Sequence, residues 1–184
     1  WTTLKLWWSM PDNRADTILG KISETFLKKG IKILNSVSYL RPYLAKEGVL
    51  TKHYPSNATN EDIDFGVSIA KEMGRLDIGQ TIVVKNKLVV AVEAMEGTDL
   101  CLERAGALAG ENCTVIKMPK PNQDMRFDVP TIGVNTIHKL AKIKATALVI
   151  EADRSLIIDK DTIKEANKAG IVLISLTRSA TEIS

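Results

Sequence analysis

The sequence predicts an α/β fold in which a mixed, mostly parallel sheet is flanked by helices and preceded by an N-terminal helical and linker segment. Strand-length apolar runs recur in the second half of the chain, among them ALVIE at 147–151 and IVLISL at 171–176. Segments with helical periodicity separate these runs, and this alternation is typical of β-α-β units. The chain has 184 residues and is 45% hydrophobic, so it can bury a core.

The first expected element is a helix over residues 15–30. Apolar side chains recur at helical spacing from Ile18 to Phe26, and Gly30 is the residue type that most often follows a helix C-terminus. The stretch IKILNS at 31–36 then predicts a short strand.

A second helix is expected between Pro55 and Gln80, with its cap near Asn60 and its end at Gly74. The stretch QTIVVKNKLVVAVEA at 80–94 contains two β-branched runs around a polar KNK turn and therefore predicts a β-hairpin.

After the hairpin, helices and strands alternate. We expect strands at 113–118, 145–152, 155–159 and 171–176, and helices that begin near Thr98 or Asp99, at Asn135 and at Asp161. This pattern divides the chain into residues 1–75, an N-terminal helical and linker segment, and residues 76–184, an α/β domain.

Composition excludes several classes of protein. A net charge of +3 with scattered basic residues argues against nucleic-acid binding. With only Cys101, Cys113, His53 and His138 available, a structural zinc site and a disulfide framework are both disfavoured. Both cysteines are expected to be buried and inert, which fits a reduced, cytoplasmic setting. No apolar run is long enough to cross a bilayer.

The N-terminal stretch WTTLKLWW has two interpretations. Its tryptophans suit an interfacial membrane anchor, because this side chain favours the membrane–water boundary. The alternative, which we favour, is a segment that contacts another domain of a longer protein.

One polar cluster follows the hairpin. Glu93, Glu96 and Asp99 lie within seven residues, and Thr98 and Asp99 stand where a helix should begin. Carboxylates this close repel one another unless a cation compensates, so Glu96 and Asp99 are candidate ligands for Mg²⁺ (or Mn²⁺), an ion that prefers oxygen. The alternative is that Asp99 caps the helix while the glutamates are solvated.

A second cluster occupies a proline-rich loop. Asp124 and Asp128 flank Arg126 between Pro121 and Pro130, which fix the backbone. One interpretation is a salt bridge that only stabilises the loop. The other is phosphate chemistry, because cations beside paired carboxylates suit a phosphate ester with an activated water. Candidate substrate-binding residues are Lys117, Lys120, Asn122, Gln123, Arg126 and Thr131, together with Thr98 from the first cluster.

Three stretches carry a family resemblance: VVAVEAMEGTD at 89–99, KMPKPNQDMRFDVPTIG at 117–133 and ALVIEADRSLIIDKD at 147–161. Together they resemble the UDP-2,3-diacylglucosamine pyrophosphatases of the LpxI type. The match falls on the C-terminal catalytic domain of that family and the linker before it. The resemblance therefore implies that residues 1–75 are this linker with a remnant of the N-terminal domain and that residues 76–184 are the catalytic domain.

The resemblance implies a magnesium-assisted hydrolase of lipid A biosynthesis, which splits UDP-2,3-diacylglucosamine into UMP and the acylated sugar phosphate lipid X. It implies that Asp124 or Asp128 is essential to catalysis. An acylated substrate implies peripheral contact with the inner membrane from the cytoplasmic side, and we also expect a homodimer. The alternative from another class is a non-catalytic nucleotide-sugar or lipid binding module.

Overall fold

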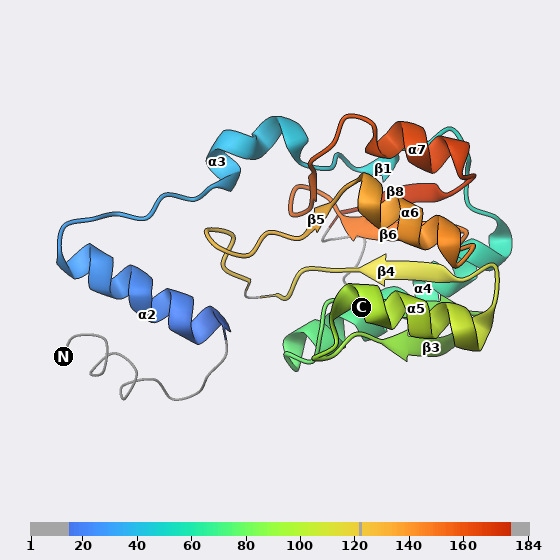
Figure 1. Cartoon of the computed structure of the whole chain (residues 1–184), viewed down its shortest axis with the longest axis horizontal. Coiled ribbons are helices and arrows are strands. Elements are labelled where there is room, and N and C mark those ends of the chain that lie inside the picture. Colours follow the sequence, from blue (N-terminus) through green and yellow to red (C-terminus); the bar gives the residue numbers. More distant parts are fainter. Residues whose placement is uncertain (1–14, 122, 178–184) are drawn as a thin grey trace. The chain divides into compact units, whose positions relative to one another are not determined.

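The structure is a computed structural model that describes residues 15–121 and 123–177 (Figure 1). The chain divides into two compact units. One contains residues 1–41 together with the loop 123–129, and the other contains residues 42–122 and 130–184. The WTTLKLWW stretch and Asn122, for which the sequence predicts roles, lie outside the described residues.

The described part of the first unit is mainly helical. Helix α2 (Ala15–Lys28) and the positive φ of 79° at Gly30 confirm the first expected element. The strand predicted at 31–36 is wrong, because this segment pairs with no strand of residues 15–121 and 123–177 and runs as irregular backbone into the short helix α3 (Val37–Leu40). The Asn35 side chain accepts a hydrogen bond from the Val37 backbone, and such local bonds compete with strand pairing.

A six-stranded mixed sheet forms the second unit. In spatial order its strands are β1 (Gly48–Val49), β8 (Val172–Leu176), β6 (Ala147–Glu151), β4 (Thr114–Lys117), β2 (Thr81–Lys85) and β3 (Leu88–Val92). The three central strands, β8, β6 and β4, are parallel, and the outer pairs on both sides are antiparallel. The strand order and the flanking helices confirm the predicted α/β class.

Two further short strands form a separate small sheet. Strand β5 (Thr131–Ile132) pairs in parallel with β7 (Leu156–Ile157). The run SLIID, expected as a short strand, forms one at Leu156–Ile157, and this strand pairs with the chain that emerges from the proline-rich loop and not with the main sheet.

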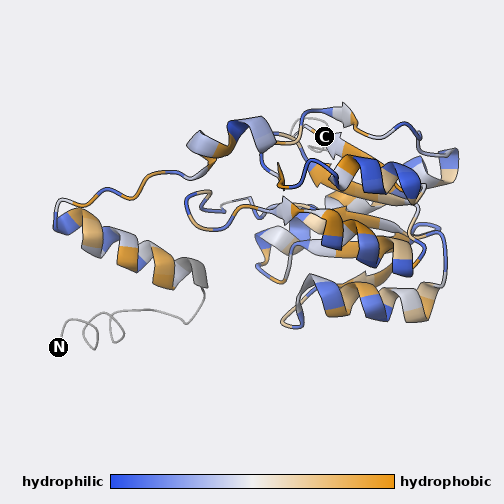
Figure 2. Cartoon of the chain, turned by 45° about the horizontal axis from the view of Figure 1, so that its top comes forward, coloured by the Kyte–Doolittle hydropathy of each residue, from blue (hydrophilic) through white to orange (hydrophobic). Residues whose placement is uncertain are grey.

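Helices cover both faces of the main sheet (Figure 1). Helix α4 (Asn57–Arg75) packs on one face, over Ile82, Ile116 and Val149. Helices α5 (Gly97–Ala109), α6 (Val134–Lys142) and α7 (Thr162–Lys168) pack on the other. Figure 2 shows the strands as the hydrophobic layer between more polar helices, the pattern of strands buried on both sides.

Details of helix ends differ from the sequence-based expectation. Helix α4 begins at Asn57, because Ser56 and not Asn60 accepts the capping hydrogen bond, from the Thr59 backbone at 3.1 Å. Helix α5 begins at Gly97, which places Thr98 and Asp99 inside its first turn. Helix α6 begins at Val134, so Asn135 does not cap it.

The predicted hairpin is confirmed as β2 and β3. Its turn residues Asn86 and Lys87 both have positive φ, 53° and 57°, as the tightest hairpin turns require. The boundary expected between residues 75 and 76 falls inside the second compact unit, because α4 packs on β2 and β4 of the same sheet.

Candidate active site

The carboxyl ends of the parallel strands carry polar side chains in the second unit. Strand β4 ends at Lys117, which stands in register with Ile150 of β6 and through it with Ser175 of β8. Strand β6 ends one residue later, at Glu151. Ligands of α/β sheets collect at this edge, so these positions are where a site is expected.

Lys117 is the start of a three-residue hydrogen-bonded chain. Its Nζ donates to Oγ1 of Thr98 at 2.8 Å, and the Thr98 hydroxyl donates to Oε1 of Glu93 at 2.9 Å. The second carboxylate oxygen of Glu93 is buried and has no hydrogen-bond partner among the described residues. The structure thus brings together two of the predicted substrate-binding residues, and it adds Glu93 to them.

Glu96 and Asp99 are placed differently from what a metal site needs. Oε1 of Glu96 lies 2.5 Å from Nη2 of Arg104, and this hydrogen bond lowers the pKa of the glutamate. Asp99 forms an ion pair with Lys139 of α6. Within residues 15–121 and 123–177, no group of three His, Cys, Asp or Glu side chains could hold a metal ion. The two predicted ligands therefore do not fit a metal held by protein side chains alone.

In the proline-rich loop, Asp124 is the anchor of a local turn. Arg126 donates to it from Nε at 2.9 Å and from Nη2 at 2.6 Å, and the hydrogen bond from Arg126 holds the pKa of the carboxyl below its usual range. The backbone amides of Phe127 and Asp128 both donate to the Asp124 carbonyl at 3.1 Å. The loop-stabilising salt bridge considered from the sequence is therefore present.

Two further contacts involve side chains of this loop. Nη1 of Arg126 donates to Oγ of Ser23 in α2 at 2.9 Å. Asp128 accepts a hydrogen bond at Oδ2 from the Gln123 side-chain amide at 2.5 Å. Asp124 thus accepts hydrogen bonds from a guanidinium, and Asp128 accepts one from a side-chain amide.

Lys120 and Thr131 stand at the two ends of this loop, in the second unit. Lys120 forms an ion pair with Asp77, which follows α4. Its backbone carbonyl also accepts a hydrogen bond from Nη2 of Arg154 at 3.1 Å. Thr131 begins β5 and pairs with Leu156 of β7.

Glu151 and Arg154 are two residues at this edge that the sequence analysis did not single out. The Glu151 side chain is only 4% exposed, and its Oε2 lies 3.5 Å from Nη1 of Arg154. The available signal was a carboxylate directly after the apolar run ALVI, since a charge at the end of a buried strand needs a partner.

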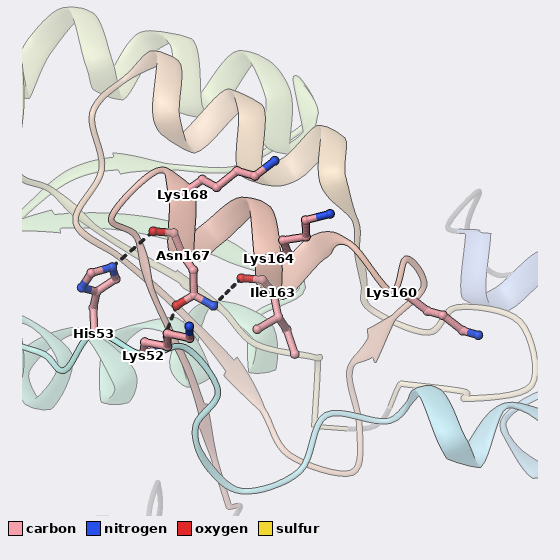
Figure 3. A pocket seen from close by; sticks show the side chains of 7 residues that line it. All are labelled: Lys52, His53, Lys160, Ile163, Lys164, Asn167 and Lys168. Carbon is pink, nitrogen blue, oxygen red and sulfur yellow. Dashed lines mark hydrogen bonds between the residues drawn. The ribbon is translucent and has the colours of Figure 1, made fainter.

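A basic pocket lies elsewhere on the second unit (Figure 3). Its volume is about 590 Å³, and it is lined by Lys52, His53, Lys160, Ile163, Lys164, Asn167 and Lys168. Asn167 joins its two walls, because its Oδ1 accepts from the Lys52 backbone at 2.7 Å and its Nδ2 donates to the Ile163 carbonyl at 2.9 Å. In Figure 3 the amino groups of Lys164 and Lys168 extend from the same side of α7.

An apolar pocket of about 510 Å³ shares Lys160 and Ile163 with the basic one. Leu44, Leu50 and Ile157 contribute to its lining. A cationic surface thus continues into an apolar recess. In the described part of the chain, no helix has both the length and the apolar character needed to cross a membrane.

Comparison with known protein families shows which family has this sequence pattern. The model of the LpxI C-terminal domain matches residues 46–174, a range that includes the Glu93–Thr98–Lys117 chain, the proline-rich loop and Arg154. The chain belongs to the LpxI C-terminal domain family. This membership confirms the resemblance seen in the sequence.

A relative of the LpxI type supports the assignment over more of the chain. The UDP-2,3-diacylglucosamine pyrophosphatase LpxI of Caulobacter vibrioides is 38% identical over 170 residues, which are 88% of this chain. The matched part is 61% of the relative, so the chain spans about three fifths of that protein's length.

Proposed function

We propose that the protein hydrolyses the pyrophosphate bond of UDP-2,3-diacylglucosamine to UMP and lipid X, a step of lipid A biosynthesis. The observation that carries the proposal is the LpxI C-terminal domain match over residues 46–174, together with a relative named for this activity. The polar side chains at the sheet edge and in the loop are of the kinds that such a reaction needs.

In the proposed reaction, a water oxygen forms a bond to one phosphorus of the diphosphate and the bridging P–O bond breaks. Asp128 takes the proton of the attacking water as general base. Asp124 is the weaker candidate for this role, because Arg126 binds its carboxylate through two nitrogens and lowers its pKa. Its task is to hold Arg126 and the turn in place.

The cationic side chains have a separate task in this proposal. Negative charge grows on the phosphate oxygens as the bridging bond breaks, and preorganised donors stabilise it. We assign this to Lys117, whose amino group is oriented by Thr98 and Glu93, with Lys120 and Arg126 as further donors. Gln123, Asn122 and Thr131 remain proposed substrate contacts.

A requirement for Mg²⁺ or Mn²⁺ also remains a proposal. Since Glu96 and Asp99 are paired with Arg104 and Lys139, the ion would arrive with the diphosphate of the substrate, as magnesium commonly does. Bound there, it would neutralise phosphate charge. Removal of divalent ions should then abolish turnover without changing the thermal stability of the substrate-free protein.

Peripheral contact with the inner membrane, on its cytoplasmic side, is proposed because a diacylated substrate resides in a bilayer. The lysine-lined pocket and the adjoining apolar recess give the second unit a surface suited to anionic headgroups. A homodimer is proposed as the assembly and is tested by sedimentation of the purified protein.

The deciding experiment measures UMP release by the full-length protein. Asp128→Ala should lower the rate by about a hundredfold or more, in line with the loss of a general base, and leave the thermal unfolding midpoint unchanged within a few degrees. Asp124→Ala should lower the rate less and loosen the loop. Substrate that binds but stays intact with and without Mg²⁺ would favour the non-catalytic binding module instead.

A further inference from the structure

The proline-rich loop leaves and re-enters the second unit at two points that one short segment holds together. At the first, Nη2 of Arg154 donates to the Lys120 carbonyl at 3.1 Å. At the second, the Leu156 backbone amide donates to the Pro130 carbonyl at 2.8 Å. Residues 154–156 therefore join the start and the end of the loop to each other.

That segment is itself fixed in the fold. The Asp153 amide donates to the Ala45 carbonyl, and the Ser155 carbonyl accepts from the Ala45 amide, both at 2.9 Å. The Ala152 amide donates to the Leu176 carbonyl of β8 at 2.8 Å. Backbone hydrogen bonds from two other parts of the chain thus keep the segment in position.

Arg154 forms an ion pair with Glu151 at the end of β6. The carboxylate lies at the end of a central strand with a side chain only 4% exposed, and burial of such a charge is costly unless a cation is near. Nη1 of Arg154, at 3.5 Å from Oε2, is that cation. Because Nη1 faces Glu151 and Nη2 reaches Lys120, the guanidinium is used within the protein, and its side chain is only 18% exposed.

We propose that Arg154 is a positioning residue of the reaction. It fixes Lys120 to the carboxyl edge of β6, and Leu156 fixes Pro130, so that the two points of the second unit between which the segment with Asp124 and Asp128 begins and ends keep a constant separation. The proposal rests on the proposed function for its catalytic consequence only. The hydrogen bonds that join Arg154 to Lys120 and Leu156 to Pro130 do not depend on that function. Small displacements of a reacting group lower the rate steeply, which is why such a link matters.

The test compares Arg154→Ala, Arg154→Lys and Lys46→Ala in the full-length protein. Lys46→Ala is the matched control, since it removes an exposed ion pair to Asp153, next to Arg154. Amide hydrogen exchange of peptides that cover residues 120–131 reports on the loop. Steady-state UMP release reports on kcat and KM separately.

Arg154→Ala should speed exchange in the loop about tenfold, the effect of losing one charge-assisted hydrogen bond, while peptides from β4 and β8 stay unchanged. The same variant should lower kcat by about a hundredfold and leave KM within about threefold, because orientation and not binding is lost. Arg154→Lys keeps the positive charge, but an amino group does not reach both Glu151 and the Lys120 carbonyl as the guanidinium does, so both effects should be intermediate. Lys46→Ala should match the wild type.

Unchanged loop exchange in Arg154→Lys and Arg154→Ala would overturn the proposal, as would faster exchange with an unaltered kcat. A rise in KM alone would identify Arg154 as a substrate contact and would also overturn it. If Arg154→Ala fails to fold, Arg154→Lys decides. A wild-type protein that releases no UMP would contradict the proposed function, whereas the exchange measurement would still decide the link between Arg154 and the loop.

Discussion

Lys117 at the end of β4 and Thr98 in the first turn of α5 are joined by a hydrogen bond of 2.8 Å between Nζ and Oγ1. The same hydroxyl donates to Glu93 at 2.9 Å, so one threonine lies between a cation and a half-buried carboxylate. A lysine amino group on its four-carbon side chain can otherwise adopt many orientations. The hydrogen bond to Thr98 restricts the amino group of Lys117 to one of them.

Thr98 should therefore be required for turnover although it is neither acid nor base. Thr98→Val should lower kcat/KM about tenfold or more and lower stability by about 1–3 kcal/mol, because Glu93 and Lys117 both lose a partner. Thr98→Ser should retain most of both. Thr146→Val, which removes another side-chain hydrogen bond, to the Cys113 carbonyl, is the control for activity. Equal activity of Thr98→Val and wild type would show that the hydrogen bonds of Thr98 to Lys117 and Glu93 do not contribute to turnover.

The carboxyl of Asp124 should titrate below its usual range. Because its pKa is lowered in the folded protein, the ionised form stabilises the fold above the unperturbed pKa of about 3.9. That contribution is lost as the pH falls through the lowered folded value. Carbon NMR should show the titration midpoint of Asp124 rising in Arg126→Ala, and Arg75→Ala should leave it unchanged. An unaltered midpoint in Arg126→Ala would contradict the assigned cause.

Gly66 should not tolerate a larger residue. A Cβ at this position of α4 would lie 2.4 Å from Cδ1 of Ile116 and 2.8 Å from Cγ2 of Val84. Gly66→Ala should therefore cost about 1–3 kcal/mol of unfolding free energy, measured by denaturant titration. Gly20→Ala, in helix α2 with no heavy atom within 4 Å, should be neutral or stabilising. Equal effects of the two substitutions would refute the packing explanation.

Lysines of the basic pocket should contribute to binding of anionic membranes. Each lysine near such a surface is worth about 1 kcal/mol, so Lys52→Ala with Lys160→Ala should weaken binding to phosphatidylglycerol vesicles by about tenfold or more. Flotation at two salt concentrations measures this. Arg75→Ala with Lys142→Ala removes the same charge from α4 and α6 and should have a small effect. Loss of binding in both double variants alike would indicate net charge and not this surface.

Cys101 should be unreactive in the folded protein. Its side chain is fully buried, and burial raises the pKa of the thiol to about 11. At pH 8 almost no thiolate is present, and iodoacetamide should leave the residue unmodified until denaturant is added. Mass spectrometry of the alkylated peptide checks this. Rapid alkylation under native conditions would show that the α5 side of the core opens.

Much of the second unit was predictable from the chain alone. Alternating β-branched runs around Asn86 and Lys87 predicted the hairpin, and the apolar runs at 147–151 and 171–176 predicted buried strands. These features are local, since they depend on side-chain periodicity and on backbone preference within a few residues. The loop with Asp124 and Arg126 was likewise found from its composition, because residues two apart can pair without help from the rest of the fold.

Tertiary structure decided which charges meet across the chain. Glu96 and Asp99 were candidate metal ligands by sequence spacing, yet Arg104 and Lys139 approach them, and Lys139 comes from another helix. Arg154 reaches Lys120, 34 residues away, only because β6 lies beside β4 in the sheet. The sequence determined the elements and the chemistry available at their ends. The order of the strands in the sheet determined which of those ends lie next to each other. Hydrophobic periodicity within one strand does not indicate which strand pairs with it.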